Sequence, residues 1–134
     1  DKQMSVSVSG FYIALTAIMA VFFTYRVVRL RRGLKIGLGS GGSDELRLAN
    51  RVHANLIENA PMALLLLLVA ELNGLAPVYL HGAGTIWLVA RILHAIGLTQ
   101  GQGGYHFGRF WGVLLSWLVI LALALVNLIY FILA

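Results

Sequence analysis

The sequence has no cysteine, little charge and only two prolines, and the first two shortages narrow what the protein can be. Without cysteine it has neither disulfides nor a thiol nucleophile of its own, so any thiol chemistry needs a thiol that arrives with a substrate. Charged residues make up 11% of the 134 residues, far below the roughly 25% of soluble domains. With 60% hydrophobic residues, the composition predicts a membrane protein with a single domain over residues 1–134.

The pattern of polar residues argues against three further kinds of site. The net charge is +5, but the basic residues cluster at the ends of apolar segments, as membrane topology requires, so no nucleic-acid partner is predicted. The four histidines lack the close spacing of metal ligands, and no metal site is predicted. Gly37, Gly39 and Gly42 match a G-x-G-x-x-G pattern, but no strand precedes them as a dinucleotide site needs, and a flexible connector is expected.

Four apolar segments are long enough to cross about 30 Å of hydrocarbon as helices. We expect membrane-spanning helices over residues 11–30, 44–72, 78–98 and 106–131. Basic residues gather at the end of the first segment: Arg26, Arg29, Arg31, Arg32 and Lys35. Because positive charge marks the cytoplasmic side, the first loop is predicted to be cytoplasmic and both termini to lie outside. Asp1, Lys2 and Gln3 precede Met4, where we expect the native chain to start.

Local signals refine these helices. Ser43 or Asp44 is suited to cap the second helix, because a short oxygen side chain accepts a free amide at a helix start. Pro61 lacks an amide hydrogen and is expected to kink that helix. Gly82 and Gly84 in the third helix allow a neighbouring helix to approach closely.

The second helix carries a stripe of polar residues, which is unfavourable in a membrane-spanning segment. At 100° per residue, Arg51, Asn55 and Glu58 fall within roughly a 60° arc of one face. Each ionisable group near the centre of a bilayer costs on the order of 3 kcal/mol or more, so such residues are functional candidates. The planar guanidinium of arginine suits carboxylates, which predicts a site for a small, polar, anionic molecule.

The other helices place polar residues at the same level of the membrane. They are Arg31 and Arg32, Arg91 and His94, and Tyr105 and Arg109. His53 lies about 200° around the second helix from Arg51, nearly opposite. If both faces are polar and buried, a second subunit should cover one of them. A compact trimer with this helix at its centre would satisfy that requirement, although the helical wheel does not fix the number of subunits.

The pattern from Arg51 to Pro61, R-x-x-x-N-x-x-E-x-x-P, resembles the signature of the membrane-associated proteins in eicosanoid and glutathione metabolism, the MAPEG family. The resemblance covers nearly the whole chain and is greatest to the family's small bacterial inner-membrane branch. It implies a homotrimer of four-helix subunits with a glutathione site between neighbours, periplasmic termini and a cytoplasmic active-site end. The implied activity is a transferase or peroxidase that adds the activated thiol of glutathione to a lipophilic electrophile or reduces a hydroperoxide.

The resemblance also implies roles for single residues. Those that would bind glutathione are Arg31, Arg51, His53, Asn55, Glu58, Asn59 and His94. Arg109, together with Arg32, would act on the thiolate, and His53, Arg31 and Arg32 would reach the site of the next subunit. Two positions depart from the family pattern, because Asn59 and Leu98 stand where tyrosines are found in relatives. Lipids and lipophilic molecules would occupy the grooves between subunits.

Other readings of the same residues remain open. The polar stripe of the second helix is also explained as a structural network that ties the bundle together. A separate alternative is that His94 pairs with Glu58 as a structural contact and does not touch a ligand. A non-enzymatic protein of the same fold would hold or present a lipid, and the leucine at position 98 favours it. A small transporter is the third alternative, although the sequence shows none of the internal repeats typical of transporters.

Overall fold

The computed structural model describes residues 5–134 and consists of four long helices, so the expected start at Met4 lies outside the described part. The helices are α1 (Ser7–Leu34), α2 (Asp44–Leu72), α3 (Pro77–Gln100) and α4 (Phe107–Leu133). All four are long and apolar enough to cross a membrane. The prediction of an all-helical membrane protein with four spans is therefore confirmed for the single chain.

The helix ends differ from the expected spans mainly in α1. This helix begins at Ser7 instead of residue 11 and ends at Leu34 instead of residue 30. Hydropathy marks only the apolar part of a helix, and the backbone stays helical beyond it into the polar interface. In α4 the first helical residue is Phe107, because His106 is the N-cap and its Nδ1 accepts the amide of Gly108 at 3.0 Å.

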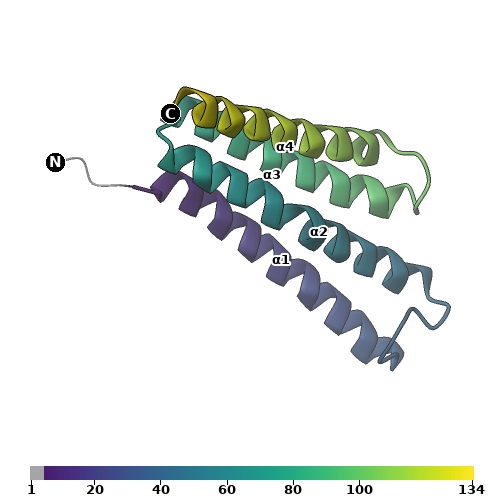
Figure 1. Cartoon of the computed structure of the whole chain (residues 1–134). Coiled ribbons are helices and arrows are strands. Elements are labelled where there is room, and N and C mark those ends of the chain that lie inside the picture. The colour runs from purple at the N-terminus through teal and green to yellow at the C-terminus, as the bar shows by residue number, and fades with distance from the viewer. Residues whose placement is uncertain (1–4) are drawn as a thin grey trace.

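The helices lie side by side, with both described chain ends at one end of the bundle (Figure 1). The loop of residues 35–43 and the loop of residues 101–106 lie together at the opposite end (Figure 1). Helices α2 and α3 occupy the middle, α1 packs on both of them, and α4 packs on both from the other side. In the described residues α1 and α4 do not contact each other. Each outer helix therefore leaves a broad apolar surface open to lipid or to another subunit.

Side chains at the helix starts satisfy amides that a helix cannot pair by itself. The Oγ of Ser43 accepts the amide of Leu46 at 3.2 Å, which confirms the cap predicted for α2. At the start of α1 this role is filled from another helix. The carboxylate of Glu71, near the end of α2, accepts the amides of Val8 at 3.2 Å and Ser9 at 2.8 Å. This contact fixes the start of α1 against the end of α2.

The core is built around Trp87 of α3, which is 1% exposed. Its indole nitrogen donates to the hydroxyl of Thr16 on α1 at 3.1 Å. Close approach of α1 occurs at Gly84, where a Cβ atom would collide with the ring of Tyr12. Gly82 faces open space, so only one of the two glycines expected to allow close packing does so. Helix α2 continues through Pro61 without interruption.

Helices α3 and α4 approach most closely near the loop of residues 101–106. A Cβ atom added to Gly97 of α3 would lie 2.5 Å from the carbonyl carbon of Gly108 and 2.8 Å from the Cα of Arg109. One turn further along α4, a Cβ on Gly112 would lie 2.6 Å from the backbone nitrogen of His94. Only glycine permits these backbone contacts, and they fix the first turn of α4, with Arg109, against α3.

Candidate functional site

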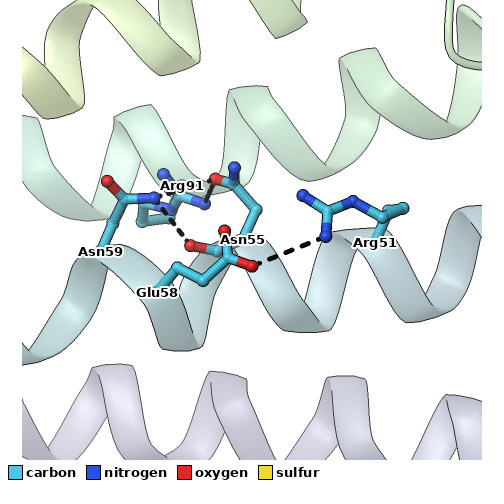
Figure 2. Close-up of polar contacts among 5 residues, drawn as sticks. All are labelled: Arg51, Asn55, Glu58, Asn59 and Arg91. Carbon is cyan, nitrogen blue, oxygen red and sulfur yellow. Dashed lines mark hydrogen bonds and ion pairs between the residues drawn. The ribbon is translucent and has the colours of Figure 1, made fainter.

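The polar stripe of α2 makes two sets of contacts on its helix face, an ion pair and a group of amide hydrogen bonds (Figure 2). The Nη1 atom of Arg51 lies 3.6 Å from the Oε1 atom of Glu58, two turns further along. On the same helix, the Nδ2 group of Asn59 donates to the backbone carbonyl of Asn55 at 2.8 Å. The helical period brings these residues together, as the sequence predicts, because residues spaced by three, four and seven share a face.

The ion pair of this stripe is open to the outside of the four-helix bundle. The side chain of Arg51 is 53% exposed and that of Glu58 is 59% exposed, although both belong to a helix that is apolar enough to span a membrane. A pair exposed to hydrocarbon would lose its hydration without gaining hydrogen-bond partners, which is unfavourable. The stripe therefore requires a polar cover, from water, from headgroups or from another subunit.

Arg91 of α3 contacts Asn55 of the stripe from the interior of the bundle, and the sequence did not predict this contact. Arg91 is 2% exposed, and its Nη2 atom donates to the Oδ1 atom of Asn55 at 2.5 Å (Figure 2). Its Nη1 atom donates to the Oγ atom of Ser116 on α4 at 3.1 Å. The guanidinium also lies over the ring of Trp87, 5.4 Å from the ring centre. Arg91 therefore joins three helices at the level of the stripe.

His94 lies one turn beyond Arg91 and is 3% exposed. The alternative in which it pairs with Glu58 is not what the structure shows, because Glu58 pairs with Arg51 instead. Arg91 precedes His94 by one turn on α3, and Arg51 of α2 and Arg109 of α4 are also close enough to act on its charge. These three arginines belong to three different helices, so the structure brings a cluster of positive charge around one buried imidazole.

Arg109 lies in the first turn of α4 and is partly buried. Its Nη1 atom donates to the carbonyl oxygens of Gly103 and Gly104 in the preceding loop, which holds the side chain at the end of the bundle. A groove of about 500 Å³ runs from this loop along α4. The groove is lined by Tyr105, His106, Arg109, Phe110, Val113, Leu114 and Trp117, together with the two loop glycines.

The basic residues at the end of α1 do not join the stripe of α2 within one subunit. Arg31 turns back to its own loop and donates to the carbonyl oxygens of Gly39 at 2.8 Å and Ile36 at 3.4 Å. Arg32 is exposed, and His53 is half-buried on α2. The sequence predicts that all four helices place polar residues at one level. Of these helices, α2, α3 and α4 supply the connected network through Asn55, Arg91 and Ser116.

Among residues 5–134, no group of three or more histidine, aspartate and glutamate side chains is arranged to hold a metal ion. The polar atoms that converge at this end of the bundle are mostly guanidinium and amide groups. Such groups donate hydrogen bonds and attract anions, so their chemistry fits a small organic anion better than a cation.

Comparison with known proteins gives this arrangement a family. Residues 9–129 match the sequence model of the MAPEG family. The chain is also 35% identical over 127 residues to the inner membrane protein YecN of Escherichia coli K12, an alignment that covers 92% of each protein. The same protein of Escherichia coli O6:H1 strain CFT073 matches to the same extent. The match contains the entire α2 stripe and leaves out only the two ends of the four-helix bundle. The chain therefore belongs to the MAPEG family.

Proposed function

We propose that this membrane protein is a homotrimeric glutathione-dependent transferase or peroxidase whose site lies between neighbouring subunits. The observation that carries the proposal is the exposed ion pair of Arg51 and Glu58 on a membrane-spanning helix. A second subunit packed against this face would remove the pair from lipid and enclose a polar cavity. An anion in that cavity would find donors from Arg51 and Asn55 and an acceptor for its amino group in Glu58.

Each subunit contributes two sets of residues to this proposed site. Arg51, Asn55, Glu58, Asn59 and His94 would bind the tripeptide in their own subunit's site. His53 and Arg31 would reach the site of the neighbour, which is consistent with their absence from the network within one subunit. Arg109 and the neighbour-facing Arg32 would act on the thiol.

The chemistry follows from positive charge near sulfur. A cysteine-type thiol has a pKa of about 8.5, so only a few per cent is thiolate at neutral pH. A nearby guanidinium favours the charged form, and the thiolate is the nucleophile. In transfer, sulfur forms a bond to an electrophilic carbon and the leaving group departs. In peroxide reduction, two thiols supply two electrons, the O–O bond breaks, and a disulfide, an alcohol and water are formed.

The groove beside Arg109 would admit the second substrate from the membrane. Its walls are mostly apolar and aromatic, and Arg109 lies at its polar end. A lipophilic electrophile or hydroperoxide that lay along α4 would place its reactive end near the guanidinium. We also infer an inner-membrane location with the site end in the cytoplasm and the termini in the periplasm. The description of the relatives as inner membrane proteins and the basic end of α1 support this inference.

Purified protein in detergent provides the test. Wild type should conjugate glutathione to a chlorinated dinitrobenzene or reduce a lipid hydroperoxide with glutathione as donor. Arg51→Ala and Arg109→Ala should each lower kcat/KM at least about tenfold, because each removes a charge-assisted contact. Arg29→Ala is the matched control, since Arg29 is an exposed arginine at the same end of the bundle but on α1. Failure of wild type to bind glutathione in calorimetry would overturn the proposal.

A non-enzymatic lipid-binding protein is the second candidate, and two observations favour it. An apolar groove of about 630 Å³ lies between α3 and α4, away from the arginine cluster. Leu98 is 5% exposed and is a core residue, where relatives use a tyrosine to touch glutathione. This candidate predicts that lipid co-purifies with the protein, as detected by native mass spectrometry, and that no electrophile or hydroperoxide is turned over.

A further inference from the structure

Arg91 is a buried cation without an acidic partner among the described residues. The residue is 2% exposed, and its guanidinium contacts an amide oxygen, a hydroxyl and an aromatic ring. Its Nε atom is the single buried side-chain nitrogen or oxygen in residues 5–134 that has no hydrogen-bond partner. Burying an unneutralised charge is unfavourable, so a hydrophobic residue at this place would serve stability better. We therefore look for the role of Arg91 in the side chains that it contacts.

What Arg91 holds is the side-chain amide of Asn55. A guanidinium can only donate hydrogen bonds, so the amide oxygen of Asn55 must face Arg91. The same oxygen also accepts from the Nδ2 atom of Asn59 at 3.3 Å. With its oxygen engaged twice, Asn55 must direct its NH₂ group away from both donors. That NH₂ group has no acceptor within residues 5–134. It is also not fully buried, so it can be reached from outside the bundle.

The identity of the residue at position 55 matters for the charge. An aspartate would also accept from Arg91, but it would neutralise the guanidinium and offer no donor to a guest. Asparagine leaves the positive charge of Arg91 in place behind a fixed NH₂ donor. Both features favour a guest that presents an acceptor with negative charge, such as a carboxylate.

We propose that Arg91 is a positioning residue that fixes the amide of Asn55 as a hydrogen-bond donor toward a small carboxylate-bearing guest. The inference depends on the proposed function only where the guest is identified as glutathione. Arg91 acts here through Asn55 and does not touch the guest. Ser116 anchors the other end of the guanidinium to α4, and Trp87 supports its face.

A double-mutant cycle on ligand binding tests this role. Wild type, Arg91→Gln, Asn55→Ala and the double variant are titrated by calorimetry, in detergent, with glutathione and with citrate, a tricarboxylate that has no thiol. In the wild-type background, Arg91→Gln should weaken binding about tenfold, because a donor to a charged acceptor is no longer oriented. In the Asn55→Ala background the same change should weaken binding less than about threefold, because the group that Arg91 positions is gone.

Ser116→Ala is the matched control, because it removes the other partner of Arg91 and leaves Asn55 held. It should weaken binding less than about threefold. A purely structural Arg91 would give equal losses in Arg91→Gln and Ser116→Ala, or equal losses in both cycle backgrounds, and either result overturns the proposal. If Arg91→Gln does not yield folded protein, the cycle is run with Arg91→Lys, which keeps the charge but lacks the planar fork.

The two probes separate this inference from the proposed function. Binding of citrate with a non-additive cycle, without binding of glutathione, would refute the glutathione-dependent activity and support the positioning role. Binding of glutathione with an additive cycle would refute the positioning role alone. Binding of neither anion by wild type would refute both.

Discussion

Replacing Gly97 with alanine should force α3 and α4 apart. The added Cβ would lie 2.5 Å from the carbonyl carbon of Gly108 and 2.8 Å from the Cα of Arg109, and even closer to the backbone nitrogen of Arg109. These are backbone atoms, so no side-chain rotation relieves the overlap. Overpacking of this kind typically costs about 1–3 kcal/mol. We expect a loss near the upper end of this range, because the helix axes themselves must move.

The free energy of unfolding can be measured by titrating the purified protein in mixed micelles with sodium dodecyl sulfate. Gly82→Ala is the matched control, since Gly82 is on the same helix and a Cβ there meets nothing within 4 Å. That variant should be neutral or slightly more stable, because alanine favours helix over glycine by up to about 1 kcal/mol. If Gly97→Ala proves as stable as Gly82→Ala, the close approach of α3 and α4 described above is wrong.

Two further variants probe contacts between helices at the other end of the bundle. Glu71→Gln should weaken the contact between the start of α1 and the end of α2 by about 1 kcal/mol. One of the two acceptor oxygens of the side chain is replaced by an NH₂ donor that faces the amide of Val8 or Ser9. Faster hydrogen exchange at those two amides, with unchanged exchange in α4, would show this, and unchanged exchange in α1 would contradict it. Asn127→Leu removes bonds from α4 to a backbone carbonyl of α2 and to Asn73, each 3.1 Å long. Since such bonds average about 0.6 kcal/mol in membranes, the unfolding free energy should fall by about that much per bond, and a gain in stability would refute the contact.

The helices could be predicted from the sequence because they depend on local properties. Apolar length placed all four of them, and the cap at Ser43 followed from a short oxygen side chain at the helix start. The α2 stripe was equally predictable, since the helical period alone puts Arg51 and Glu58 on one face. Where a boundary was displaced, as at the start of α1, hydropathy had marked only the apolar part of the helix, and the added turn is capped by Glu71, which is distant in the sequence.

Contacts between helices could not be predicted in the same way. The pairing of Arg91 with Asn55 depends on how α2 and α3 are rotated and shifted relative to each other, which a helical wheel does not specify. One signal for Arg91 was present, because an arginine in an apolar helix needs a partner. Similarly, nothing in the sequence distinguished Gly82 from Gly84, although only Gly84 packs against an aromatic ring. The assignments of Arg109, Arg32 and the glutathione residues remain predictions from the resemblance.

The bundle has an even number of helices suited to cross a membrane, and its described chain ends lie at one end (Figure 1), which has a practical consequence for work in living cells. A reporter protein fused ahead of α1 and one fused after α4 must read the same compartment, so a disagreement between them would reveal a misinserted helix. Affinity tags at either end should leave the arginine-rich end untouched, because the full thickness of the bilayer separates them from it.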